Sequence, residues 1–96
     1  MMRNPPHPGE ILKEEVLAPL DMSVAEAAKR LGMCRVVFSR VLNRKAGISP
    51  DLAVRLERAG VSTARAWLGM QANYDLWQVK QREPPPVRRL QEPAAA

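Results

Sequence analysis

Several kinds of residue are scarce in this chain, and each scarcity removes a class of protein from consideration. The single cysteine, Cys34, has no second cysteine to pair with in the chain, which is typical of proteins from a reducing compartment. No stretch approaches the roughly 20 apolar residues that a membrane-spanning helix needs. The first residues also do not resemble a signal peptide. The sequence therefore predicts a cytoplasmic protein.

Aromatic residues and histidine are also rare. The two Trp, one Tyr and one Phe leave Leu, Val, Ala and Met to fill most of a small core. His7 is the only histidine, so a cluster of histidine metal ligands is excluded. Glu14 and Glu15 are adjacent and point to different faces of a helix, so they do not form a catalytic pair. We therefore expect neither enzymatic activity nor a cofactor.

Acidic residues are missing from the middle of the chain. The whole sequence has 15 Lys and Arg against 10 Asp and Glu, which gives a net charge of +5. The segment 29–45 contains no acidic residue and these basic ones: Lys29, Arg30, Arg35, Arg40, Arg44 and Lys45. Such a segment is either a solvated surface or a contact for a polyanion, and its local concentration favours the polyanion.

Capping and turn residues predict five helices, at about residues 8–18, 24–31, 35–42, 50–59 and 63–80. Ser23 and Glu26 have the spacing of a capping box, and Ser49 precedes Pro50 as an N-cap. Cys34 and Ser62 take the cap positions of the third and fifth helices. We expect residues 8–82 to form one all-α domain, after an extended lead at 1–7 and before a disordered Pro-rich tail at 83–96.

The second and third predicted helices have the pattern of a helix-turn-helix. Ala28 is small enough to let another helix cross closely, and Gly32 suits a left-handed turn. Phe38 and Val41 give the third helix one apolar side. A short helix with a basic outer side fits the major groove of DNA, so the segment predicts DNA binding.

An aromatic stripe marks the last predicted helix. Trp67, Met70, Tyr74 and Trp77 recur at intervals of three, four and three residues, which places them on one helical face. Such a stripe either completes the core or, where it extends beyond the core, forms an interface. We expect these four residues to form the interface of a homodimer.

Blocks at residues 7–12, 27–32, 39–43, 47–50, 67–68 and 71–77 together resemble the Xre/lambda-repressor-like helix-turn-helix proteins, and more narrowly the HigA-type antitoxins. This resemblance implies a five-helix, homodimeric domain that binds operator DNA with inverted half-sites. It also implies that the protein represses its own operon and neutralises a HigB-like mRNA-cleaving toxin. Two alternatives remain open at this point: a stand-alone phage-like repressor without a toxin, and a protein-binding scaffold with little DNA affinity.

The predicted DNA-binding residues lie in and around the third helix: Lys29, Arg30, Cys34, Arg35, Val36, Ser39, Arg40, Asn43, Arg44 and Lys45. We expect Arg35 and Arg40 to read bases, and the remaining basic residues to hold phosphates. Val36 either contacts a thymine methyl group or packs against its neighbours. Cys34 stands where the family has Ser or Thr, and Arg44 where it has glycine.

A toxin-binding surface is expected on the first helix. Glu10, Glu14 and Glu15 would oppose a basic toxin. The same carboxylates alternatively serve only the helix dipole and solubility. The tail at 83–96 has few apolar anchors, so we expect the toxin to bind the folded domain.

Overall fold

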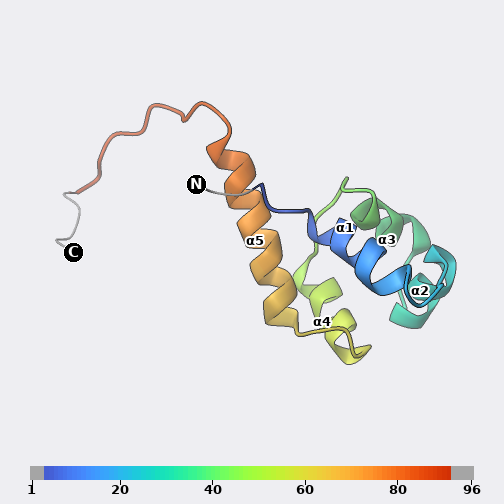
Figure 1. The fold of residues 1–96 in the computed structure, drawn as a ribbon. Coiled ribbons are helices and arrows are strands. Elements are labelled where there is room, and N and C mark those ends of the chain that lie inside the picture. The colour runs from blue at the N-terminus through green and yellow to red at the C-terminus, as the bar shows by residue number, and fades with distance from the viewer. Residues whose placement is uncertain (1–3, 92–96) are drawn as a thin grey trace.

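Helices form all the regular structure of residues 4–91, the part of the chain that the computed structural model describes (Figure 1). In chain order they are α1 (Pro8–Ile11), the π-helix η1 (Leu12–Leu17), α2 (Val24–Leu31), α3 (Arg35–Leu42), α4 (Pro50–Arg58) and α5 (Ala64–Lys80). The predicted all-α class and the predicted helical segments are confirmed. No helix within the described residues is both long and apolar enough to cross a membrane.

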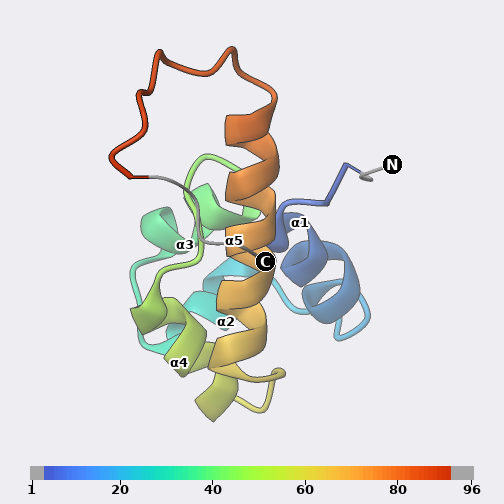
Figure 2. The same ribbon diagram turned by 90° about the vertical axis from the view of Figure 1, so that its left-hand side faces the viewer.

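The core lies where the short helices meet the first half of α5. The two views in Figures 1 and 2 show α5 lying against the other helices and extending past them at its C-terminal end. Phe38 and Ala53 are completely buried, and Ile48 is buried as well. The other buried hydrophobic residues are Leu12, Leu17, Ala27, Ala28, Val41, Leu42, Leu52, Leu56 and Trp67.

The first helix differs from the regular α-helix that its sequence predicts. After α1 the backbone widens, and the amide of Ala18 donates to the carbonyl oxygen of Lys13 at 3.0 Å, five residues earlier. Leu12 and Leu17 are also five residues apart, and the wider turn brings both into the core. The π-helix therefore buries two leucines that a regular helix would direct to different sides.

The expected cap of the last helix is displaced by one residue. Ser62 takes a left-handed conformation with φ 58°, so it belongs to the preceding turn. The N-cap is Thr63, whose Oγ1 atom accepts a hydrogen bond from the amide of Ala66 at 3.1 Å. The Glu57 carboxylate accepts from the amide of Ala64 at 2.8 Å, which satisfies another free donor at this helix end.

The aromatic stripe of α5 faces the protein's own body, so the prediction that Trp67 lies in a dimer interface is wrong. Trp67 is 2% exposed, and its Nε1 atom donates to the carbonyl oxygen of Val61 at 2.8 Å. Met70 packs against the core, and Tyr74 lies edge-on against His7. Trp77 is half-buried, with its ring centroid 6.5 Å from that of Tyr74.

The two ends of the described chain behave differently. His7 belongs to the predicted lead, yet it is buried and its Nδ1 atom accepts from the amide of Gly9 at the start of α1. Residues 83–91 form no helix, are exposed and lead away from the helices (Figure 1). The disorder expected for 83–96 stays a prediction, because residues 92–96, like 1–3, lie outside the described part.

Candidate nucleic-acid interface

The helix-turn-helix is built around the end of α2. Gly32 adopts φ 67° and ends α2, as its sequence position predicts. Its amide donates to the carbonyl oxygen of Lys29 at 3.1 Å, and the amide of Met33 donates to that of Ala28 at 3.0 Å. These bonds close the last turn of α2 and direct the chain into α3. Ala28 is buried where α2 packs against its neighbours.

Helix α3 has a buried and an open side. Its buried side consists of Phe38, Val41 and Leu42. On the opposite side Val36, Arg40 and Asn43 are exposed, and their spacing of four and three residues places them in one row. Arg35 is exposed at the first position of the helix, and Ser39 is half-buried on the flank. We call Val36, Arg40 and the C-cap residue Asn43 the outer row of α3.

Hydrogen bonds hold two polar side chains of α3 in place. The Nη2 atom of Arg40 donates to the carbonyl oxygen of Lys45 at 3.3 Å, so this guanidinium leans toward the loop after α3. Asn43 donates through Nδ2 to the hydroxyl of Ser39 at 3.2 Å. The predicted base reader Arg40 therefore sits between the helix surface and the loop, whereas Arg35 has no such partner among the described residues.

Basic residues from two other segments flank α3. Lys29 and Arg30 are exposed at the end of α2, where Arg30 pairs with Glu26 at 2.9 Å. Lys45 is exposed in the loop after α3, next to Arg44. The outer row lies on α3, and the flanking basic residues lie at the end of α2 and in the loop after α3. Their joint contact with DNA stays a prediction.

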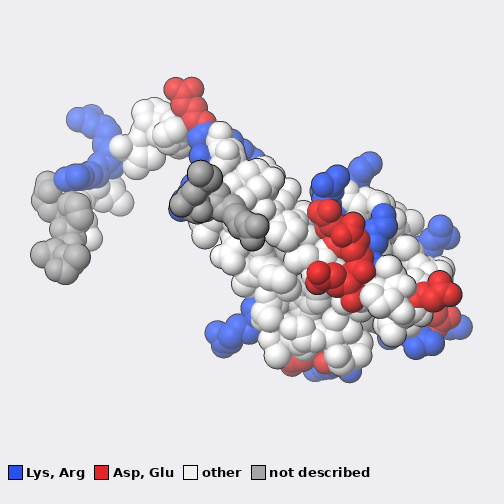
Figure 3. Space-filling view, in the orientation of Figure 1, with Lys and Arg blue, Asp and Glu red and all other residues white. Residues whose placement is uncertain are grey.

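Arg44 connects this region to the acidic face of the first helix. It adopts φ 62°, as expected for a residue that stands in a glycine position, and its Nη1 atom lies 4.0 Å from the Glu10 carboxylate. Glu14 and Glu15 are exposed on η1. Figure 3 shows acidic side chains over α1 and η1, with basic side chains beside them. The predicted acidic cluster is therefore in place, but one of its carboxylates has a cationic neighbour.

Cys34 takes the predicted N-cap position of α3 with extended backbone, and its side chain is exposed. The thiol forms no capping hydrogen bond, as expected from the weakness of sulfur as an acceptor. The backbone amides of Val37 and Val36 nevertheless favour the thiolate and lower the pKa of Cys34.

Known proteins are similar to this chain in sequence over most of its length. No family profile matches it. Virulence-associated protein A of Dichelobacter nodosus is 46% identical over 79 residues, which cover 81% of this chain and 78% of that relative. Antitoxin HigA-1 of Vibrio cholerae is 32% identical over 80 residues, covering 83% of this chain and 75% of the relative. The chain belongs to the HigA-type antitoxins.

A solved structure of this family extends the similarity to three dimensions. Antitoxin GraA in complex with its operator matches this HigA-type chain with a TM-score of 0.77 and 37% identity, over 84% of this chain and 81% of GraA. The match confirms the fold at the level of the family, including its helix-turn-helix arrangement.

Three further residues of this region have contacts or exposure that the sequence did not predict. Val37 is 52% exposed beside Val36, so the apolar part of the α3 surface is larger than predicted. Gln71 on α5 accepts a hydrogen bond from the amide of Ile48 at 2.8 Å, which ties the loop after α3 to α5. Arg55 on α4 contacts the end of α2, and its only signal in the sequence is its position four residues after Asp51.

Proposed function

We propose that this chain is an antitoxin and autorepressor that inserts α3 into the major groove of operator DNA. The outer row of α3 carries the proposal: it is exposed, uncharged or basic, and backed by a buried apolar side that holds the helix in place. Helix-turn-helix proteins read bases with the N-terminal part of this helix. The relative GraA has been captured with its operator, which supports the same use of the fold here.

Each residue of the interface has a distinct expected role. Arg35 and Arg40 fit bidentate contacts with guanine, and the exposed methyl groups of Val36 fit the methyl group of thymine. Ser39 and Asn43 already share a hydrogen bond, so they would bind DNA as a preformed pair. We assign the expected phosphate contacts to the flanking residues Lys29, Arg30, Arg44 and Lys45. We place the backbone near Cys34 at the edge of the groove.

The pairs Arg30–Glu26 and Arg44–Glu10 do not argue against phosphate contacts. All four side chains are substantially exposed, with side-chain exposures between 41% and 65%. Exposed pairs of this kind contribute little free energy, about 0–1 kcal/mol. A phosphate can therefore replace the carboxylate as the partner of either arginine.

A comparison of Arg40→Ala with Lys45→Ala tests the DNA-binding role. Arg40→Ala should weaken binding to an operator by about 1–3 kcal/mol and affect random DNA much less, whereas Lys45→Ala should weaken both about equally. Fluorescence anisotropy at several salt concentrations measures both affinities and the number of phosphate contacts. Unchanged operator affinity of Arg40→Ala would show that α3 is oriented differently in the groove.

Dimerisation fits the side of α5 that faces away from the body. Gly69, Ala72, Leu76 and Val79 are exposed there at intervals of three, four and three residues, and we call them the outer seam of α5. Leu76 is 56% and Val79 58% exposed, while Gly69 and Ala72 are small enough to let a second helix approach closely. Two copies joined along this seam would present two α3 helices to inverted half-sites, about 34 Å apart.

Toxin neutralisation follows from family membership, and relatives such as HigA-1 carry the name antitoxin. We assign the toxin contact to Glu10, Glu14 and Glu15 on α1 and η1, because they are the acidic side chains on a face free of the outer row of α3. The same protein would then bind operator and toxin in the cytoplasm through two surfaces that meet at the Arg44–Glu10 pair.

A further inference from the structure

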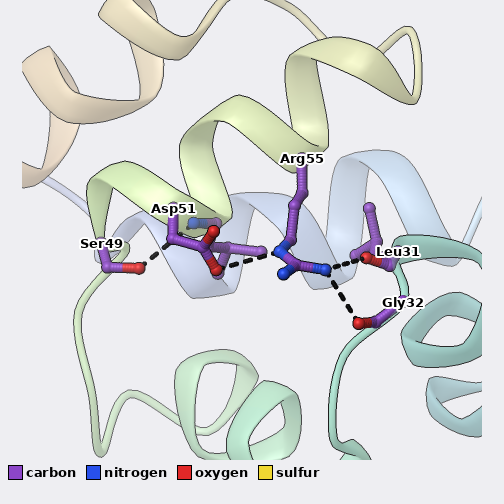
Figure 4. A network of polar contacts seen from close by, with 6 residues as sticks. Leu31, Gly32, Ser49, Asp51 and Arg55 are labelled. Carbon is purple, nitrogen blue, oxygen red and sulfur yellow. Dashed lines mark hydrogen bonds and ion pairs between the residues drawn. The ribbon is translucent and has the colours of Figure 1, made fainter.

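Arg55 joins α4 to the turn of the helix-turn-helix. Its Nη1 atom donates to the carbonyl oxygens of Leu31 and Gly32, each at 2.8 Å (Figure 4). Its Nε atom donates to Oδ2 of Asp51, one turn earlier on α4, at 2.9 Å. A single side chain thus contacts the last residue of α2 and the first residue of the turn that leads to α3.

The end of α2 has carbonyl groups that receive no hydrogen bond from a backbone amide of the helix. The carbonyls of Ala28 and Lys29 already accept from the amides of Met33 and Gly32. Those of Leu31 and Gly32 lie beyond the last helical hydrogen bonds and carry the negative end of the helix dipole. A guanidinium is the favoured partner there, because it is always charged and presents several donors in a rigid plane.

The guanidinium is itself held from both sides. Asp51 fixes its orientation, and Ser49 caps α4 by accepting from the amide of Leu52 at 3.2 Å (Figure 4). Leu52 and Leu56 anchor α4 in the core. On the other side, a Cβ atom at Gly32 would lie 3.3 Å from Nη1, so the turn fits closely around the side chain.

Arg55 does not lie in α3, and the outer row does not include it. We propose that Arg55 is a positioning residue for sequence-specific DNA binding, which sets the angle of α3 by clamping the end of α2 to α4. This inference rests on the proposed DNA binding by α3. Because base contacts require side chains at defined positions whereas phosphate contacts tolerate small rotations, loosening the clamp should reduce operator binding and spare binding to random DNA.

The test compares Arg55→Gln, Arg55→Lys and Arg58→Gln on two DNA probes. One probe is a duplex selected from a random-sequence pool by the full wild-type chain, and the other is random duplex DNA. Arg58 is an exposed arginine on the same helix and contacts no backbone carbonyl of the turn, so Arg58→Gln controls for the loss of one positive charge. Circular dichroism sets a temperature at which every variant is folded.

Arg55→Gln should weaken binding to the selected duplex by about tenfold, the effect of roughly 1.4 kcal/mol from lost charged hydrogen bonds. Its binding to random DNA should match that of Arg58→Gln, and the salt dependence of operator binding should match too, because neither variant loses a phosphate contact. Arg55→Lys should recover part of the preference, since lysine keeps the charge but not the planar donor array. If Arg55→Gln does not fold, Arg55→Lys and Asp51→Asn provide the same comparison.

Equal losses on both probes, or a salt dependence reduced by about one phosphate contact, would overturn the inference in favour of a direct phosphate contact by Arg55. Unchanged preference in every folded Arg55 variant would overturn it as well. If the wild-type chain selects no duplex at all, the proposed DNA binding itself fails. If the wild type selects a duplex and an Arg55 variant binds that duplex equally well, only the role of Arg55 fails.

Discussion

The imidazole of His7 packs edge-on against the phenol ring of Tyr74, with the ring centroids 4.8 Å apart and the ring planes at 73°. The contact joins the residue before α1 to the middle of α5. His7 also accepts the amide hydrogen of Gly9 through Nδ1 at 2.9 Å, which requires an unprotonated Nδ1 atom. One neutral histidine thus both caps α1 and holds it against α5.

This dual role makes the stability of the fold sensitive to mild acid. Burial is the main cause that lowers the pKa of His7, and Arg44 adds to it, whereas Asp75 and Glu10 oppose it. Because the folded pKa lies below the ordinary value of 6.5, the unfolded chain takes up the proton first. The contribution is complete above pH 6.5 and is lost as the pH falls through the lowered pKa of the folded chain. Thermal unfolding followed by circular dichroism at a series of pH values should show this loss.

His7→Asn is the matched control for the pH effect. Asparagine is a good N-cap residue and does not titrate, so the variant keeps a hydrogen-bond acceptor for Gly9. Between the pKa values of His7 in the unfolded and the folded wild-type chain, the melting temperature of the variant should vary less with pH than that of the wild type. An identical pH profile for both proteins would show that carboxylates, and not His7, cause the acid sensitivity.

Gly9 should tolerate no larger residue, because a Cβ atom there would collide with the carbonyl oxygen of Val41 on α3. Gly9→Ala must push α1 away from α3, so we expect a destabilisation of about 1–3 kcal/mol. Urea unfolding monitored by circular dichroism gives the free energy directly.

Gly69→Ala provides the opposite case. A Cβ atom at Gly69 meets nothing within 4 Å, and alanine favours the helix interior by about 0.5–1 kcal/mol. Both substitutions are best compared in a Leu76→Asp background, so that association along the outer seam does not contribute. A Gly9→Ala variant as stable as its parent would mean that α1 can shift relative to α3 without cost.

The helices were predictable from sequence where short-range signals define them. Ser23 with Glu26, and Ser49 with Pro50, place helix starts through contacts that span three residues or fewer, and the structure confirms both. The spacing of Phe38 and Val41 likewise identified the buried side of α3. Such features depend only on residues that are close together in the chain, so they can be predicted from the sequence alone.

Features that depend on distant partners were missed. The clamp formed by Arg55 reaches carbonyls 23 and 24 residues away, and nothing near Arg55 in the sequence indicates that target. Trp67 and Tyr74 share one helical face, but periodicity alone does not say whether the protein's own body or a second copy covers that face. The contact with Val61 decides the question in favour of the body for Trp67. Met70, Tyr74 and Trp77 are only half-buried, so the dimer contact expected of them stays a prediction.

The outer seam of α5 should control dimerisation. Leu76→Asp would place a carboxylate in an apolar contact without a partner, which is unfavourable. We expect the dimer affinity to fall by about tenfold or more, and sedimentation at micromolar concentration should show mainly a 10.7 kDa monomer. Operator binding should lose its cooperativity in parallel.

Val87→Asp is the matched control, because this substitution introduces the same charge at a residue that is 81% exposed in the segment after α5. It should leave the dimer intact. A dimer that persists in Leu76→Asp, or a wild-type chain that is monomeric under the same conditions, would contradict the assignment of the seam.

The acidic face of α1 and η1 should control toxin binding. Reversing the charge of the exposed residues Glu14 and Glu15 to lysine should weaken binding of the adjacent gene's product by about tenfold, mainly through slower association. Added salt should reduce the difference between variant and wild type, since exposed charges are screened. Surface plasmon resonance with the co-purified toxin measures both rates.

A chain that ends at Arg82 separates this surface from the tail. It should bind the toxin as tightly as the full chain, because residues 83–91 are exposed and offer only Val87 and Leu90 as large apolar groups. A matching Glu83→Lys variant in the full chain changes charge in the tail and should have no effect on the association rate. Loss of toxin binding on truncation, together with normal binding by the Glu14 and Glu15 double variant, would move the toxin contact from the folded domain to the tail.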